Sequence, residues 1–389
     1  MASRRCVLLY VQHLLGIGHV FRALRIADAL VEAGLDVHLV LGGKPFDLPP
    51  TRARLHQLPA IVSGEGGFSE LTEASGRPVD EAFRAERRRL LLELYTRLAP
   101  DVLILEAFPF GRRQMRFELL PLLERARSDP RRPLIVSSVR DILQRPRSPD
   151  KAAEAIDLAQ RCFHLVLVHG DPAMARLEDS FPGAEQVATL VRYTGLVGPG
   201  EVRRWTEASF PVVVSAGGGA VGARLLHAAV EARASTSLAD AAWCLITGPN
   251  LPEGERQRLV KKAGTGMHVV RFVSNLPGLL AEARLSISQC GYNTVADILA
   301  AGCRSVVVPF ATGGETEQTE RAAKLERAGR AVSVSEGALN GASLASAIGH
   351  ALQLPQPSRA ASPKGAQTSA SIILQALAEP NARSRAAAE

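Results

Sequence analysis

The sequence is poor in cysteine and in long apolar runs. Its five cysteines among 389 residues show no paired spacing, which argues against a disulfide framework or a cysteine-rich metal site. No apolar run approaches the ~20 residues that cross a bilayer. The first expected strand begins so close to Met1 that no secretory signal is expected, and the predicted compartment is the reducing cytoplasm. The cysteines, most of them in or beside apolar strands, are Cys6, Cys162, Cys244, Cys290 and Cys303.

Aromatic residues and paired acids are also scarce. Aromatics make up 5% of the chain and do not alternate with basic residues, which argues against a protein that binds single-stranded nucleic acid. The Asp-x-Asp pattern that would hold a divalent ion does not occur. We therefore expect no nucleic-acid partner, no metal site and no cofactor.

The charge is unbalanced, with a net value of +7 and a pI of about 9.5. Arginines gather in segments such as Arg84–Arg89. One interpretation is a solvated helix face in an arginine-rich protein. The other is a patch for anionic lipid or an anionic acceptor, which would allow peripheral contact with the inner face of the plasma membrane. Both interpretations remain open at this stage.

Short Val/Leu/Ile segments alternate with helical stretches along the whole chain, as in α/β folds with buried parallel sheets. Glycine and proline cluster at Gly195–Gly200, which predicts a linker. We predict a first domain over 1–196, a second over 197–355, and a tail over 356–389 with a crossing helix and a disordered end. The expected strands are Cys6–Val11, Val37–Leu41, Asp101–Leu105, Leu134–Val139, Leu165–Val168, Val212–Ser215, Trp243–Thr247, His268–Val273, Leu285–Ser288, Ser305–Pro309 and Ala331–Val334.

Each half has a glycine-rich turn after its first strand. In the first half, Gly16 and Gly18 would let backbone approach a ligand, and His19 follows at the start of a helix. The third glycine of a dinucleotide fingerprint is replaced by Phe21, so that interpretation fails. His19 is either a structural residue or a functional one, donating to a phosphate or acting as a base.

The turn of the second half matches G-x-G-x-x-G at Gly217, Gly219 and Gly222. A dinucleotide site would need an acid at the end of the next strand, but Trp243–Thr247 is followed by glycine. The loop is therefore predicted to bind phosphate, with a ligand-free tight turn as the alternative.

The segment Ser286–Asp297 is the most informative part of the chain. A strand runs into a turn at Gly291, and a helix starts directly after it with Asn293 and Thr294. A helix N-terminus offers N–H groups and partial positive charge, which suit a diphosphate. Asp297, about one turn into the helix, can accept from a ribose hydroxyl. These features predict a site for a nucleoside diphosphate.

These motifs resemble the donor-binding half of the MurG-like glycosyltransferases, which have the GT-B architecture of two Rossmann-like parallel-sheet domains facing across a cleft. The likeness covers most of the chain and is strongest from Val212 to Gly329. Asp297 stands where that family usually has Glu, and Glu317-Gln318 stands where it has a Gln pair. The resemblance implies a donor site, with Phe272 and Val273 against uracil, although Phe272 could instead pack in the core. The implied donor residues are Gly18, Gly217, Gly218, Gly219, Arg224, Phe272, Val273, Gly291, Asn293, Thr294, Asp297, Glu317 and Gln318.

Charged residues also follow two expected strands of the first half. Ligands bind at the carboxyl ends of the strands in open α/β sheets, so these side chains are predicted to meet at the mouth of a cleft. Salt bridges among them are the alternative to acceptor binding. They are Glu106, Arg112, Arg113 and Arg140 as acceptor residues, and Asp141 as a second candidate base.

The sequence and the resemblance together predict an inverting, metal-independent transferase. It would move a hexose, with N-acetylglucosamine as one candidate, from a UDP-sugar to a hydroxyl of a small-molecule, glycan or lipid-linked acceptor. His19 or Asp141 would be the general base. The alternatives are a UDP-sugar hydrolase or epimerase on the same fold, and a non-catalytic donor-binding subunit of a two-chain transferase.

Overall fold

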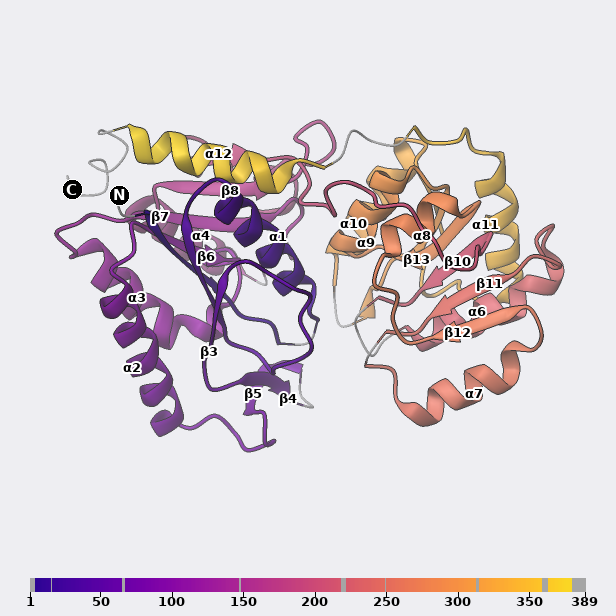
Figure 1. Ribbon diagram of the computed structural model, residues 1–389, viewed down its shortest axis with the longest axis horizontal. Helices are drawn as coiled ribbons and strands as arrows, with labels where there is room; N and C mark the ends of the chain where they lie inside the picture. Colours follow the sequence, from indigo (N-terminus) through magenta and orange to yellow (C-terminus); the bar gives the residue numbers. More distant parts are fainter. Residues whose placement is uncertain are drawn as a thin grey trace. The chain divides into compact units, whose positions relative to one another are not determined.

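The computed structural model divides the chain into two compact units. Unit 1 comprises Met1–Val197 and Lys364–Glu389, and unit 2 comprises Gly198–Pro363. The structure describes residues 4–14, 16–64, 67–146, 148–217, 222–248, 250–312, 315–358 and 363–379. Figure 1 shows the two units.

Unit 1 is built on a seven-stranded parallel sheet of order β3-β2-β1-β6-β7-β8-β9. Five of its strands coincide with the predicted apolar segments to within one residue at each end, because runs of Val, Leu and Ile buried on both faces are typical of parallel strands. These are β1 (Cys6–Val11), β2 (Asp36–Leu41), β6 (Val102–Glu106), β7 (Leu134–Arg140) and β8 (Leu165–His169).

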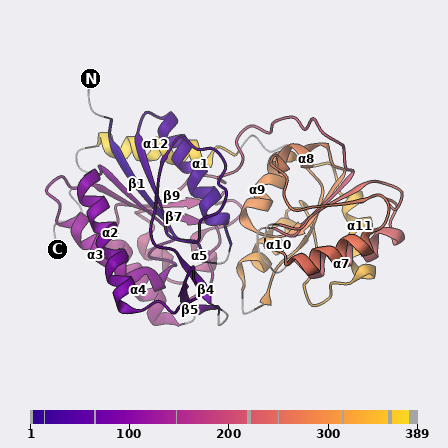
Figure 2. The same ribbon diagram turned by 60° about the horizontal axis from the view of Figure 1, so that its bottom comes forward.

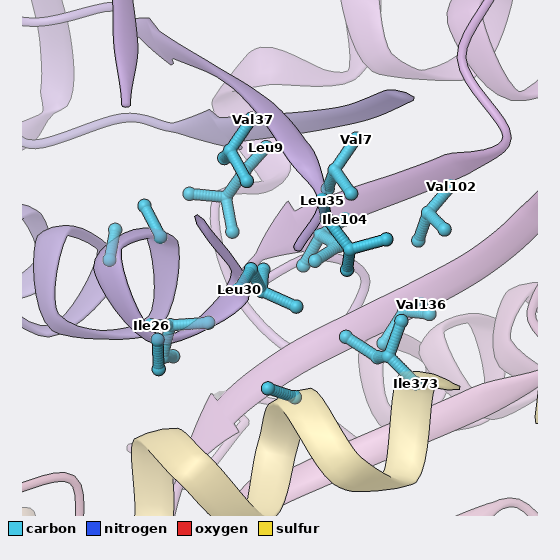
Figure 3. Packing of buried hydrophobic residues seen from close by; sticks show 14 of the residues in the cluster. Val7, Leu9, Ile26, Leu30, Leu35, Val37, Val102, Ile104, Val136 and Ile373 are labelled. Atoms are coloured by element: carbon cyan, nitrogen blue, oxygen red, sulfur yellow. The ribbon is translucent and has the colours of Figure 1, made fainter. Parts of the chain in front are cut away.

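Helices cover both faces of this sheet. On one face, Leu30 of α1 and Ile373 of α12 pack with Leu9 and Ile104 of the strands, as Figure 3 shows. On the other face, the strands pack against α2 and α3, which lie side by side in Figure 2. The helices of unit 1 are α1 (Gly18–Glu32), α2 (Glu81–Leu98), η1 (Arg113–Met115), α3 (Arg116–Arg127), α4 (Pro149–Cys162), α5 (Leu177–Ser180), η2 (Ala184–Val187) and α12 (Gly365–Ala378).

Four short strands of unit 1 were not predicted. β3 (Arg54–Gln57) and β9 (Val191–Tyr193) are the two edges of the sheet, and β4 (Ile61–Gly64) and β5 (Gly67–Glu73) form a separate antiparallel pair. None of the β3 residues is buried. The apolar run that identifies a central strand is therefore absent from this edge.

Unit 2 has a six-stranded parallel sheet of order β12-β11-β10-β13-β14-β15. Its strands are β10 (Val212–Ser215), β11 (Trp243–Ile246), β12 (Met267–Val270), β13 (Leu285–Gln289), β14 (Ser305–Val308) and β15 (Val332–Ser333). Helices α6, α7 and α11 pack on one face, and α8 and α9 on the other. The helices are α6 (Ala223–Ala232), η3 (Arg233–Ser235), α7 (Glu253–Ala263), α8 (Leu276–Glu282), α9 (Tyr292–Ala301), α10 (Glu317–Arg327) and α11 (Gly341–Gln353). The prediction of two parallel-sheet α/β domains is confirmed.

The C-terminal helix belongs to unit 1. α12 lies beside α1 in Figures 1 and 2, and Ala366, Ala370 and Ile373 are buried against the unit 1 core. The chain returns at Lys364, where the N–H of Gly365 donates to the carbonyl oxygen of Leu196 at 3.0 Å. The division thus falls after Val197, one residue later than predicted, and unit 2 runs on to Pro363. The predicted disordered end lies outside the described residues.

Arg87, a buried arginine of α2, joins this helix to α3 and to the residues that follow β1 and β2. Arg87 of α2 has no exposed surface, and its Nε donates to Glu118 of α3 at 2.7 Å. Its Nη2 donates to the side-chain oxygen of Gln12 at 2.6 Å, and its Nη1 to the carbonyl oxygen of Gly42 at 2.8 Å. Burial alone would lower the pKa of Arg87, but the Glu118 carboxylate raises it above its ordinary value, so Arg87 is charged. These contacts fix Gln12, at the base of the first glycine loop.

None of the helices in the described ranges is both long and apolar enough to cross a membrane.

Candidate functional site

The first glycine loop places His19 over a buried carboxylate. His19 is the second residue of α1, and its Nδ1 lies 2.9 and 3.0 Å from the two carboxylate oxygens of Glu106, at the end of β6. Since a carboxylate only accepts hydrogen bonds, the Nδ1 position carries the proton and Nε2 keeps its lone pair. The His19 side chain is 16% exposed, whereas Glu106 is 1% exposed. The buried carboxylate of Glu106 therefore fixes the orientation of the imidazole ring.

Burial keeps His19 neutral, and the neighbouring groups keep Glu106 ionised. Burial lowers the pKa of His19 to about 3, although the Glu106 carboxylate acts in the opposite direction. Burial alone would raise the pKa of Glu106, but His19 and the ion-paired Arg22 of α1 lower it below its ordinary value. The neutral imidazole leaves Nε2 able to accept a proton, as a general base must.

His169, a buried histidine at the carboxyl edge of the same sheet, was not predicted. His169 ends β8; its Nε2 lies 2.8 Å from Ser138 Oγ on β7, and its Nδ1 lies 2.9 Å from Thr194 Oγ1. Burial lowers the pKa of His169 to about 3, and Arg22 contributes in the same direction. Its position at the carboxyl end of a strand was the available signal, but the apolar run around it indicated only a core strand.

Because His19 and His169 are neutral in the folded protein, we expect its stability to decrease in acid. The ordinary pKa of histidine is about 6.5, so below that pH the unfolded chain binds protons that folded His19 and His169 do not. The free energy of unfolding should therefore fall as the pH decreases from about 6.5 to about 3, by up to ~1.4 kcal/mol per pH unit for each histidine. Urea unfolding at several pH values should show a shallower dependence in His169→Asn. Equal slopes in the two proteins would contradict this origin.

The predicted acceptor residues have different environments. Arg112 follows β6 in a left-handed conformation, with φ of 56°, and its Nε donates to the carbonyl oxygen of Gln12 at 2.8 Å. Arg113 pairs with Glu154 of α4, which also binds Arg116. Arg140 ends β7, where it is in register with His169. Glu106 is buried under His19, so direct acceptor contact does not fit its position.

Asp141, the second candidate base, directly follows β7. Its side chain is 8% exposed, and its Oδ1 accepts from the N–H of Ile142 at 2.8 Å. Gly170 lies so close that a Cβ there would be 2.4 Å from the Asp141 Cβ. The carboxylate therefore accepts from the backbone of the next residue, and the side chain is tightly packed.

In unit 2, the glycine loop after β10 requires glycine at two positions. Gly217 has φ of 72°, a left-handed conformation that other residues rarely adopt. A Cβ on Gly222 would lie 2.2 Å from the Cβ of Ala216, so only glycine lets α6 start this close to the strand. Gly218 and Gly219, also predicted to bind a donor, lie outside the described residues.

The turn after β13 leads into α9 as the sequence predicted. Gly291 is the N-cap residue, and α9 begins at Tyr292 with Asn293 and Thr294 in its first turn. A Cβ on Gly291 would meet nothing within 4 Å, so this glycine is not required for packing. Asp297 is 7% exposed and lies one turn further along the helix.

The first turn of α10 links two neighbouring loops. The Gln318 side-chain oxygen accepts from the N–H of Phe310 at 3.1 Å and holds the loop after β14. Glu317 is 3% exposed and pairs with Arg321 at 2.8 Å, so its carboxylate lies within the protein. Arg321 was not predicted, because a charged residue in the middle of a polar helix carries no signal of burial.

The remaining predicted donor residues differ in exposure. Arg224 on α6 donates to the carbonyl oxygen of Leu339 at 3.1 Å, which connects the start of that helix to the loop before α11. Phe272 is 65% exposed, so the alternative that it packs in the core is wrong. Val273 is the half-buried neighbour and packs against the core of α8 and α9.

Within the described ranges, no group of three His, Cys, Asp or Glu side chains is placed to hold a metal ion.

The comparisons with known proteins agree with these observations. Residues 213–376 match the glycosyltransferase family 28 C-terminal domain. A UDP-N-acetylglucosamine–N-acetylmuramyl-(pentapeptide) pyrophosphoryl-undecaprenol N-acetylglucosamine transferase of Ralstonia nicotianae is 29% identical over 182 residues, or 46% of this chain and 50% of that protein. The structure of Acinetobacter baumannii MurG aligns with a TM-score of 0.59 at 17% identity, covering 95% of this chain and 99% of that one.

The chain has the GT-B fold, and its second unit matches the glycosyltransferase family 28 C-terminal domain. The structure of Phytolacca americana UGT2 complexed with UDP-2-fluoro-glucose and pterostilbene shares this fold with a TM-score of 0.63 at 13% identity, covering 96% of this chain and all of that one. The chain spans about half or less of the length of the curated relatives it matches. The matched family domain covers nearly all of unit 2 and most of α12.

Proposed function

We propose that the protein is an inverting glycosyltransferase that moves a hexose from a UDP-sugar to an acceptor hydroxyl. The observation that carries the proposal is the neutral His19, held by the buried Glu106 at 2.9 Å, in a chain with a family 28 C-terminal domain. His19 Nε2 would take the acceptor proton as the sugar is transferred. We favour His19 over Asp141 as the base because Asp141 is 8% exposed and packed tightly against Gly170, whereas His19 is 16% exposed.

The donor would bind to unit 2. Its diphosphate would lie against the Gly217–Gly222 loop and the first turn of α9, where N–H groups and helix dipoles offset the charge of the leaving group. Asp297 would accept from the ribose, and the exposed Phe272 would lie against the uracil. Curated relatives act on UDP-N-acetylglucosamine by name, which makes an N-acetylhexosamine donor the first to test.

The acceptor would bind to unit 1, near His19. Arg112, in the loop after β6, and Arg140, at the end of β7, would suit an acceptor with an anionic group. The named relatives use an undecaprenol-linked acceptor, so we include lipid-linked acceptors and peripheral contact with the cytoplasmic face of the membrane in the proposal. Small-molecule and glycan acceptors are tested beside them, and no nucleic-acid partner is proposed.

A UDP-release assay with a panel of UDP-sugars tests this function. With acceptor present, UDP release should accompany glycoside formation and should survive EDTA, because helix N-termini supply the leaving-group stabilisation. Loss in EDTA with rescue by Mg²⁺ or Mn²⁺ would contradict metal independence. Fast formation of free sugar or of an epimer without acceptor would instead indicate a hydrolase or an epimerase on the same fold.

We expect Asp297→Ala to weaken UDP binding more than it destabilises the fold. Loss of one hydrogen bond to a charged group costs about 1.5–3 kcal/mol, or roughly 10- to 150-fold in affinity. Titration calorimetry with UDP measures this change. Asp240→Ala, an exposed acid of the same unit, is the matched control and should bind UDP like the wild type. An unchanged affinity in Asp297→Ala would place the ribose elsewhere.

A further inference from the structure

Unit 2 contains a buried ion pair that has no part in the proposed contacts with the nucleotide-sugar donor. Arg321 and Glu317, one turn apart on α10, are both 3% exposed. The Arg321 Nη2 lies 2.8 Å from Glu317 Oε1, and its Nη1 donates to the carbonyl oxygen of Cys290 at 3.2 Å. The guanidinium carbon also lies 5.7 Å from the centre of the Tyr292 ring.

These contacts reach the turn from which α9 begins. Cys290 is the first residue after β13, Gly291 is the N-cap, and Tyr292 is the first residue of α9. Arg321 therefore touches the residues on both sides of the N-cap. The N–H of Val295 donates to the carbonyl oxygen of Gly291 at 3.0 Å, so a shift of this turn also shifts the first turn of the helix.

The charge of Arg321 requires Glu317. A buried cation without a partner is costly, whereas the paired charges and their hydrogen bonds offset that cost. While Nη2 is paired with Glu317, Nη1 donates to the Cys290 carbonyl oxygen and the guanidinium carbon lies over the Tyr292 ring. The pair thus holds the start of α9 against α10 through a fixed, planar group that a lysine does not reproduce.

We propose that Arg321, paired with Glu317, is a positioning residue for the nucleotide-sugar donor. It sets the first turn of α9, and with it Asn293, Thr294 and Asp297, without contacting the donor. This inference rests on the proposed function, in which that turn binds the UDP moiety. Small displacements of a positioned group strongly reduce binding and rate, so loss of Arg321 should appear in donor affinity.

The test measures UDP affinity by calorimetry and thermal stability by circular dichroism in three full-length variants. Arg321→Met removes the cation, and Arg321→Lys keeps the charge beside Glu317 but loses the planar group. Lys262→Met is the matched control, because it removes a surface pair between Lys262 and Glu231 that also joins two elements of unit 2.

We expect Arg321→Lys to remain folded with a melting temperature within a few degrees of the wild type and to bind UDP at least fivefold more weakly. Arg321→Met should bind still more weakly if it folds, and Lys262→Met should not change the affinity. Wild-type UDP affinity in Arg321→Lys would overturn the inference while leaving the proposed function intact. Failure of the wild type to bind UDP would instead refute the proposed function itself.

Discussion

His19→Ala should lower turnover by about 10²–10⁴-fold, which is the contribution of a positioned general base. The Nδ1 of this histidine is held at 2.9 Å from Glu106, and its burial keeps the imidazole neutral. Affinity for UDP should stay within a few-fold of the wild type, because the proposed nucleotide site lies in unit 2. Steady-state kinetics with saturating UDP-sugar and acceptor measure the loss in kcat.

Two variants complete this test. Glu106→Gln keeps the size of the side chain but removes the charge that orients His19, so it should also lower kcat with little change in UDP affinity. His350→Ala changes an exposed histidine of α11 and should be fully active. Near wild-type turnover in His19→Ala would exclude His19 as the base and leave Asp141 as the candidate.

Arg87→Met should destabilise the fold by about 3–5 kcal/mol, which is the cost of leaving one partner of a buried ion pair without the other. The change leaves the Glu118 carboxylate buried beside α2 and also removes the donors to Gln12 and Gly42. Urea unfolding followed by circular dichroism measures the effect.

Arg89→Met is the matched control on the same helix. The Arg89 side chain is 52% exposed and pairs with Glu86 and Glu93 on the surface. Such pairs contribute about 0–1 kcal/mol, so this variant should unfold close to the wild type. Similar losses in the two variants would contradict the structural role assigned to Arg87.

The central strands of both units could be predicted from the sequence because burial on both sheet faces produces unbroken apolar runs. β1 was predicted with its observed ends, Cys6 and Val11. Edge strands gave no such signal, since β3 exposes Leu55 and its flanking polar residues. The membership of α12 in unit 1 depends on contacts with α1 that no local pattern encodes.

The turns of the candidate site could be predicted from the local sequence. Gly217, His19 and the start of α9 all follow strands at the carboxyl edge of a sheet, where ligands bind in such folds. The partners of these residues were not predictable, because they come from distant segments. Glu106 lies 87 positions from His19 in the sequence, and Arg321 lies 31 positions from Cys290.

Calorimetric titration of the full chain with UDP, in buffer containing EDTA and with NADH as the comparison ligand, tests the central claim most directly. The account predicts saturable binding of one UDP per chain without a metal ion and no binding of NADH. At 100 times its Kd, UDP should add about 2.7 kcal/mol to the free energy of unfolding. An absence of UDP binding, or binding of NADH in its place, would contradict the assignment of unit 2 as a nucleotide-sugar domain.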